Sequence, residues 1–214
     1  GWKEYGWRLK KDKQYYHIIN KIPKNLSEIE GKKVLIAGEQ GIGDNIMFGR
    51  YLLLINNIVP SFSFLLRKDL HKLFSYSLKD KNITILDKAK FENFDYVIPL
   101  LSLPELFGTN KDNIPATNYI NYDSELHNKI TQYFDTNRIK VGICWRGKLE
   151  PKYNRKRHIK LKQLLTAFAD DNLNRFSLFN LQYEFNKEES DLLVDNDVSN
   201  LMSEILDISK TALI

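Results

Sequence analysis

The strongest candidate for a ligand-binding or catalytic site in this sequence is the stretch GEQGIGDNIMFGRY, residues 38–51, because of its residue types and their spacing. Glycines at the end of an apolar run let the backbone approach a ligand, and free N–H groups at the start of a following helix attract negative charge. The stretch lacks the Gly-Lys-Ser/Thr of a P-loop, and Ile46 stands where a dinucleotide fingerprint has its third glycine. Two interpretations stay open: a ligand-binding loop, or a turn in which Asp44 merely caps the helix.

The second candidate is CWRGKLEPKYNRKRHIKL, residues 144–161, which follows another apolar run. Its basic loop (residues 145–158) collects at least six positive charges, and guanidinium groups beside a strand end suit the oxygens of a diphosphate. A run of charge is also typical of a solvated surface, and this alternative stays open. The residues with basic side chains are Arg146, Lys148, Lys152, Arg155, Lys156, Arg157 and His158.

Other reactive residue types give weaker signals. The DND of residues 195–197 matches a short Asp-x-Asp metal motif, but the four histidines are scattered without paired spacing, so we expect no metal site. Cys144 falls within a predicted strand, which favours a buried filler over a nucleophile. A single cysteine excludes an intramolecular disulfide, and the expected compartment is the cytoplasm.

Composition narrows the classes of partner. The formal charge is +5, yet the chain has 24 lysines and 8 arginines, and arginine is the better reader of nucleic-acid grooves. Lys, Asn and Ile are abundant, as in proteins from AT-rich genomes, so we expect no nucleic-acid partner. Apolar runs fall short of the roughly 20 residues that span a bilayer, so we expect no membrane span.

The elements that would position these loops alternate between strands and helices, which is typical of α/β proteins. An N-terminal segment (residues 1–31) precedes the first unit (32–137), and a restart of the strand-and-loop theme opens the second (138–214). The pattern predicts strands at 32–38, 61–66, 82–87, 94–100, 139–145 and 176–182, and helices at 45–57, 68–78, 102–108, 124–134 and 161–170.

Three stretches in order carry a resemblance: GEQGIGDNIMFGRYL, FDYVIPLLSLPELFGT with a later IP, and VGICWRG with the segment around Arg157. Preceded by YGWRLK, they resemble the glycosyltransferase-like region that follows tetratricopeptide repeats in many bacterial proteins. That region is similar to the lipopolysaccharide heptosyltransferases of glycosyltransferase family 9. The resemblance covers nearly the whole chain. It implies a GT-B architecture, with a Rossmann-like acceptor domain and a second Rossmann-like domain for a nucleotide-sugar.

The resemblance also implies roles for individual residues. Asp44 would be the general base that takes a proton from an acceptor hydroxyl as its oxygen attacks the anomeric carbon. The nucleotide-sugar is the donor substrate, and neither a metal nor a further cofactor is expected. Substrate-binding positions would be Gln40, Gly41, Gly43 and Arg50. Donor-phosphate positions would be Trp145, Arg146, Gly147, Lys148 and Arg157.

The family's Asp-Thr-x-x-x-His donor motif would lie beyond Ile214, so we expect the second domain to be incomplete here. The intact form would transfer a sugar from a nucleotide-sugar to a glycan or protein acceptor, and this chain would be inactive alone. The open edge of the partial sheet would need cover from the N-terminal segment or from a second copy in a homodimer. The alternative is a non-catalytic module that keeps the fold to bind a glycan or a protein.

Overall fold

The computed structural model describes residues 1–131, 134, 137–147, 158–169, 175–201 and 207–212. Two compact units divide the chain, Gly1–Tyr122 and Asp123–Ile214. The boundary precedes the one expected from the sequence at 137/138, because the segment before the second sheet packs with that sheet. Its Phe134 ring lies 4.7 Å from the ring of Phe179, centroid to centroid.

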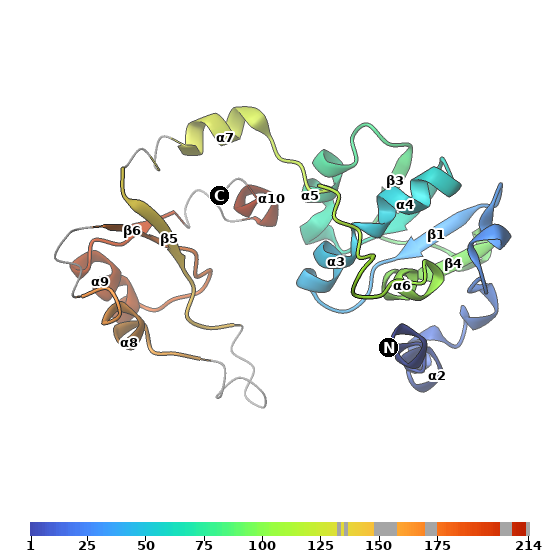
Figure 1. The fold of residues 1–214 in the computed structure, drawn as a ribbon, viewed down its shortest axis with the longest axis horizontal. Coiled ribbons are helices and arrows are strands. Elements are labelled where there is room, and N and C mark those ends of the chain that lie inside the picture. The colour runs from blue at the N-terminus through green and yellow to red at the C-terminus, as the bar shows by residue number, and fades with distance from the viewer. Residues whose placement is uncertain (132–133, 135–136, 148–157, 170–174, 202–206, 213–214) are drawn as a thin grey trace. The chain divides into compact units, whose positions relative to one another are not determined.

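The first unit is built on a sheet of four parallel strands in the order β3-β2-β1-β4. Figure 1 labels β1, β3 and β4 of this sheet. Leu35 of the first strand pairs with Ser63 on one side and Val97 on the other. The sequence order of the strands reverses between β1 and β4, because β2 and β3 follow on one side of β1 and β4 lies on the other. Open α/β sheets bind ligands at the carboxyl ends of the strands near such a point. The strands are β1 (Val34–Ala37), β2 (Phe62–Leu65), β3 (Ile83–Leu86) and β4 (Tyr96–Pro99).

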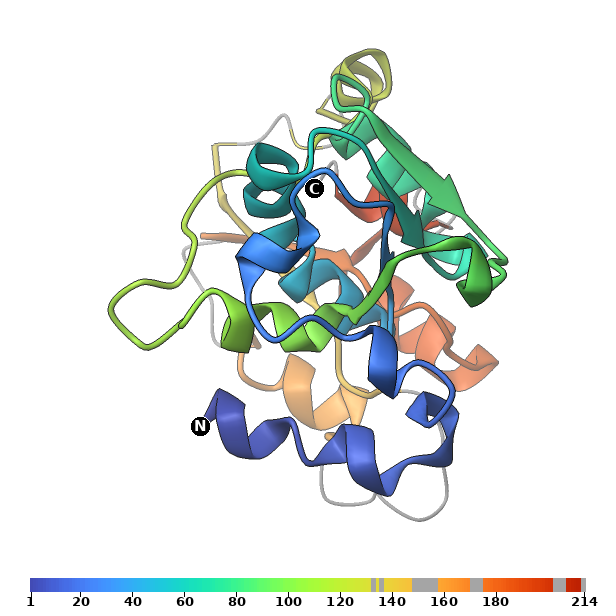
Figure 2. The same cartoon turned by 90° about the vertical axis from the view of Figure 1, so that its right-hand side faces the viewer.

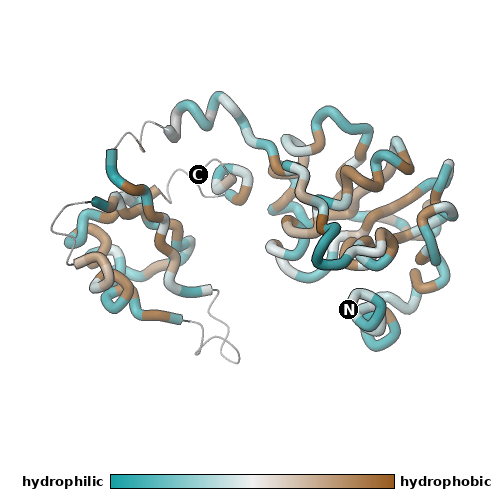
Figure 3. The backbone as a smooth tube through the Cα atoms, in the orientation of Figure 1, coloured by the Kyte–Doolittle hydropathy of each residue, from teal (hydrophilic) through white to brown (hydrophobic). Residues whose placement is uncertain are grey.

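Buried apolar side chains lie on both faces of this sheet, as expected of parallel strands. Figure 3, which colours the backbone by hydropathy, shows hydrophobic residues in brown along this unit. On one face the Phe64 ring packs edge-on against Phe74 of a following helix, 5.3 Å between centroids. On the other face Leu35 and Val97 pack against buried side chains of the N-terminal segment, among them Ile18. In Figure 2 the N-terminal segment, drawn in blue, runs along the first unit.

The glycine-rich stretch leads into two helices where the sequence predicted one at 45–57. The break falls at Gly49 and Arg50, between α3 and α4. A Cβ on Gly49 would lie 2.7 Å from the Phe74 ring, so the glycine allows close packing on the next helix. The helices and 3₁₀ turns of this unit are α1 (Trp2–Tyr5), α2 (Arg8–Lys11), η1 (Lys13–Tyr15), η2 (Ile19–Lys21), η3 (Leu26–Ile29), α3 (Ile42–Phe48), α4 (Tyr51–Ile58), η4 (Lys68–Leu70), α5 (His71–Ser77), η5 (Phe91–Asn93), η6 (Leu100–Ser102) and α6 (Leu103–Leu106).

The second unit has a parallel sheet in the order β5-β6-β7, and it too is mixed α/β. One face packs on two helices through Ile143, Trp145, Leu178 and Leu193. The chain's expected α/β class, with parallel sheets, is therefore confirmed. The elements are α7 (Ser124–Thr131), β5 (Ile139–Ile143), α8 (Leu161–Leu165), β6 (Phe176–Asn180), α9 (Lys187–Asp195), β7 (Ser199–Asn200) and α10 (Ile208–Thr211).

Three described elements of the second unit, α9, β7 and α10, were not expected from the sequence. A capping box opens α9: Glu189 N–H donates to Asn186 Oδ1, and Asn186 N–H donates to Glu189 Oε2, both at 2.9 Å. The DND stretch ends α9, and Asp197 adopts a left-handed φ of 53° in the turn to β7. Its residue types therefore serve a turn. Within the described ranges, every helix is too short or too polar to cross a membrane.

Candidate functional site

The glycine loop (residues 38–44) leaves the carboxyl end of β1, and its first residue has the strictest steric demand. Gly38 N–H donates to Leu65 O at 2.8 Å, which extends the pairing of β1 with β2 by one step. A Cβ on Gly38 would lie 2.4 Å from Asn45 Oδ1 and 2.9 Å from Leu65 O. Two residues later Gln40 turns the chain with a φ of 61°. The loop is therefore held close to the end of β2.

Glu39 is the buried charge of this loop, with 5% of its side chain exposed. Arg8 donates to Glu39 Oε1 from Nη2 at 2.6 Å and from Nε at 3.2 Å. The Tyr15 hydroxyl donates to Oε2 at 2.8 Å, and Leu101 N–H donates to Oε1 at 3.2 Å. Burial raises the pKa of Tyr15, and the adjacent carboxylate raises it further, so the phenol stays a donor. Glu39 thus joins the N-terminal segment to the loops after β1 and β4.

Asp44 and Asn45 hold the start of α3. Asp44 Oδ2 accepts the Gly41 N–H at 2.9 Å, the helix-capping role that the sequence left open. The Asn45 amide donates to Glu39 O at 3.0 Å and to Gly41 O at 2.7 Å. Because both partners are carbonyl oxygens, the orientation of the amide is fixed. Asn45 Oδ1 is buried and accepts no hydrogen bond from the described residues.

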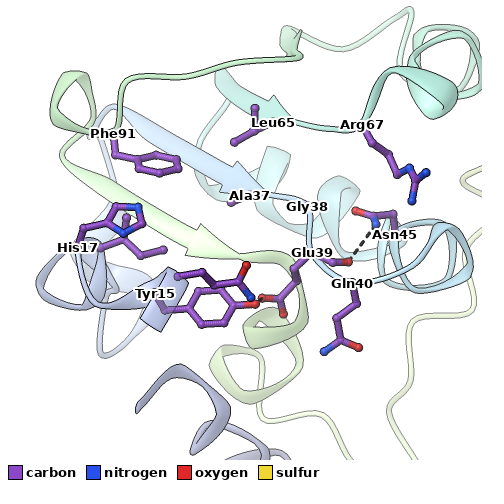
Figure 4. A pocket seen from close by; sticks show the side chains of 12 residues that line it. Tyr15, His17, Ala37, Gly38, Glu39, Gln40, Asn45, Leu65, Arg67 and Phe91 are labelled. Carbon is purple, nitrogen blue, oxygen red and sulfur yellow. Dashed lines mark hydrogen bonds between the residues drawn. The ribbon is translucent and has the colours of Figure 1, made fainter. Parts of the chain in front are cut away.

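A cavity of about 530 Å³, here the β1–β2 cavity, lies where the glycine loop meets the N-terminal segment (Figure 4). Its size falls in the range of small-molecule sites. Gly38, Glu39, Gln40 and Asn45 belong to its wall, whereas the half-buried Asp44 does not. The remaining lining residues come from the N-terminal segment, the carboxyl ends of β1 and β2 and the 3₁₀ turn η5: Gln14, Tyr15, His17, Ile18, Ala37, Leu65, Arg67 and Phe91.

The other residues expected to bind substrate lie apart from this cavity. Gly41 is the N-cap of α3, and Gly43 lies within the helix with open space beside it. Arg50 lines a different cavity of about 480 Å³, beside Trp2 and Ile114. Its guanidinium donates to the Met47 and Pro115 carbonyls. The structure therefore brings Gln40, but neither Arg50 nor Asp44, to the β1–β2 cavity.

At the carboxyl end of β5, two of the residues expected to bind phosphate are held by a carboxylate. Glu189 Oε1 accepts the Trp145 indole N–H at 2.8 Å and an ion pair from Arg146. Arg146 Nη2 donates to Glu184 O at 2.8 Å. Burial opposes the charge of Glu189, but hydrogen bonds from Arg146, the Asn186 backbone and Trp145 outweigh it, so the pKa of Glu189 lies below its ordinary value. The Arg146 charge is therefore largely compensated.

Gln182 closes the same strand end with its side-chain oxygen. Gln182 Oε1 accepts the backbone N–H groups of Trp145 at 3.2 Å and Arg146 at 3.1 Å, and the Cys144 thiol at 3.3 Å. Cys144 is exposed, so the expectation of a buried filler was wrong; the residue lies just past the end of β5. Three donors thus converge on one oxygen.

A cavity of about 380 Å³ adjoins this strand end and is lined by Cys144, Arg146, Gly147 and Gln182 among others. Gly147 is exposed and has open space beside its Cα. Lys148 and Arg157, the remaining expected phosphate ligands, lie outside the described residues. In the part of the chain that the structure describes, no three His, Cys, Asp or Glu side chains gather as a metal site would require.

Sequence reasoning missed the residues that organise both strand ends: Glu39, Asn45, Gln182 and Glu189. Glu189 had a local signal, because it stands three residues after Asn186, the spacing of a capping box before an apolar run. Glu39 and Asn45 stand inside the glycine-rich stretch; the side-chain partners of Glu39 are distant in sequence, whereas Asn45 bonds to the nearby Glu39 and Gly41 carbonyls. Compared with known proteins, the sequence matches no family model, no curated protein and no solved structure.

Proposed function

We propose that this chain is a glycosyltransferase-like protein of the GT-B type, whose first unit binds an acceptor and whose second unit is the nucleotide-sugar side. Its main support is the placement of both candidate loops. Each follows the carboxyl end of a parallel strand, and the first forms the wall of a cavity of about 530 Å³. Open α/β sheets bind ligands at such ends.

The proposed reaction of the intact form is transfer of a sugar from a nucleotide-sugar to an acceptor hydroxyl. Asp44 would take the hydroxyl proton while the acceptor oxygen attacks the anomeric carbon and the nucleoside diphosphate leaves. The carboxylate keeps Oδ1 for this task, since its capping bond uses Oδ2. In the second unit, Gly147, Lys148 and Arg157 would receive the diphosphate, with Arg146 fixing the loop through Glu189.

The second candidate is a non-catalytic module that binds a glycan or a protein. The observation that favours it is the state of the strand end after β5. The Arg146 guanidinium is shared between Glu189 and the Glu184 carbonyl, and the N–H groups of Trp145 and Arg146 are taken by Gln182. A diphosphate would have to displace Gln182 to reach those N–H groups.

Titration with UDP and with ADP, followed by amide NMR, tests the proposal. Binding to the second unit should shift the resonances of Cys144, Gly147 and Gln182, and Arg157→Ala should weaken it at least fivefold. The matched control is Lys187→Ala, which removes an exposed positive charge at the start of α9. No shift with either nucleotide would overturn the donor assignment and favour the binding module.

Transfer itself is a separate test. We expect the 214-residue chain to transfer no sugar from any nucleotide-sugar. A GT-B enzyme gains rate by orienting both substrates, and the hydrogen-bond donors at the carboxyl end of β5 are already engaged by Glu189 and Gln182. Transfer by the purified chain that Asp44→Asn abolishes would overturn this expectation of inactivity and establish the site as complete.

A further inference from the structure

We propose that the β1–β2 cavity binds a neutral, hydroxyl-bearing ring, a saccharide unit without phosphate or carboxylate. This inference rests on the proposed function, because it names the class of acceptor that the first unit would take. It concerns the groove beneath the N-terminal segment rather than the capped start of α3. The features that carry it are the hydrogen-bonding capacity of the cavity wall, its charge balance and its one aromatic end (Figure 4).

Two glutamine side chains of the wall offer hydrogen-bond acceptors. The Gln14 amide nitrogen donates to Asp12 Oδ2 at 2.6 Å, which leaves its oxygen without a donor among the described residues. The Gln40 amide nitrogen donates to the Tyr5 hydroxyl, and the Gln40 oxygen likewise has no donor among the described residues. Both side chains are exposed, so a ligand in the cavity can reach them. Hydroxyl groups can donate hydrogen bonds to both oxygens.

The charges around the cavity are compensated. The Glu39 carboxylate is paired with Arg8 and accepts two further hydrogen bonds. Arg67, on the opposite side of the glycine loop, is paired with Asp69 at 2.6 Å. A phosphate or carboxylate ligand, which accepts but does not donate, would meet the lone acceptors of the wall and would have to compete with Asp69 for Arg67. A neutral ligand meets neither obstacle.

One end of the cavity is aromatic. The His17 ring stacks on Phe91, with centroids 5.1 Å apart and an angle of 30° between the planes. Figure 4 places this pair at one end and Gln40 and Arg67 at the other, with Ala37 and Leu65 between them. A ring with an apolar face and hydroxyl groups at its edge fits this order, because the apolar face packs on the aromatic end while the hydroxyl groups reach the amides.

The probes are methyl α-glucopyranoside and methyl β-N-acetylglucosaminide, with glucose 6-phosphate as the anionic comparison. Saturation-transfer and amide NMR should show saturable binding of a neutral glycoside, with shifts at Gly38, Gln40 and the Asn45 side-chain amide. Glucose 6-phosphate should bind at least fivefold more weakly. Tighter binding of the phosphate, or no shift of cavity resonances by either glycoside, would overturn the inference.

Two pairs of variants locate the binding. Ala37→Leu fills the cavity and should weaken glycoside binding at least tenfold, whereas Ala89→Leu adds the same bulk in the same cluster outside the lining. His17→Ala should weaken binding about threefold, and the neighbouring Tyr16→Ala, which removes an exposed ring outside the cavity, should not. Because His17→Ala and Tyr16→Ala alter exposed side chains, this pair tests the location of the binding site even if Ala37→Leu impairs folding. Equal losses within each pair would contradict the proposed location.

The test of this inference can be distinguished from the test of the proposed function, because the glycosides probe the first unit and the nucleotides probe the second. Binding of UDP or ADP to the second unit without glycoside binding would refute this inference and leave the transferase proposal standing. Glycoside binding in the β1–β2 cavity without nucleotide binding would support this inference and favour the non-catalytic module.

Discussion

Replacing Arg8 by Met should destabilise the first unit strongly, because it leaves the Glu39 carboxylate buried without its counter-charge. The guanidinium and the carboxylate are 2.6 Å apart, with 14% and 5% of their side chains exposed. After the change, Glu39 would keep the bonds from Tyr15 and from Leu101 N–H, and Ser102 would lose its donor. Breaking one side of a buried ion pair costs about 3–5 kcal/mol.

The chain supplies a matched control for this prediction. Arg67 and Asp69 are also 2.6 Å apart, but 47% and 42% of their side chains are exposed. Exposed pairs contribute about 0–1 kcal/mol, so Arg67→Met should have little effect on stability. The two variants therefore compare burial at equal distance. A second comparison is Arg8→Met with Glu39→Gln, which removes both charges and should recover part of the loss relative to Arg8→Met alone.

Urea unfolding with hydrogen-exchange mass spectrometry gives the assay, because peptides from residues 33–65 report on the first unit separately. Arg8→Met should lower the unfolding free energy of these peptides by about 3–5 kcal/mol, or roughly 10–20 °C in melting temperature. Equal effects of Arg8→Met and Arg67→Met would refute the reasoning, and so would a double variant that is less stable than Arg8→Met alone.

Three further predictions concern glycines and pH. Gly38→Ala should destabilise the first unit by about 1–3 kcal/mol, because its Cβ would meet Asn45, whereas Gly43→Ala in open helix should stabilise it by about 0.5–1 kcal/mol in thermal unfolding. Glu189, whose folded pKa lies below 4.5, adds stability above that pH that is lost on acidification, so Glu189→Gln should flatten the acid limb of urea unfolding for the second unit. Tyr15, whose folded pKa is raised, adds stability below pH 10 that is lost on alkalinisation, and phenolate absorbance should show one fewer late-ionising tyrosine in Tyr15→Phe.

The strands could be predicted from the sequence because their signal is local. Each of β1, β2, β3 and β4 is a short apolar run between turn residues, and a buried parallel strand requires little more. The break between α3 and α4 could not be predicted in this way. Gly49 follows the end of α3 and leaves room for the Phe74 ring, and which side chain lies opposite Gly49 depends on the tertiary fold.

The candidate site likewise has features that could be predicted from the sequence and features that could not. Residue types indicated that the glycine loop would follow β1 and that a basic loop would follow β5; the glycine loop and the described residues 145–147 of the basic loop lie at those strand ends. They did not indicate which charges remain available. Glu39 is matched by an arginine 31 positions earlier, and Arg146 by a carboxylate 43 positions later. The sequence shows which side chains carry a charge, but which opposite charge lies beside each of them depends on the fold.

The pairing of charges within the protein limits which groups of the two loops can bind a ligand. Both predicted sites assumed that a polar side chain near a strand end is available, yet the Arg146 guanidinium is held by Glu189, and one oxygen of Asp44 is held by Gly41. At the β1–β2 cavity, the acceptors without a donor among the described residues are neutral: the amide oxygens of Gln14 and Gln40. Where charges are paired within the protein and amide oxygens are not, a neutral hydrogen-bond donor gains more from binding than an anion does. For the first unit we therefore expect the ability of a ligand to donate hydrogen bonds to matter more for its affinity than its charge.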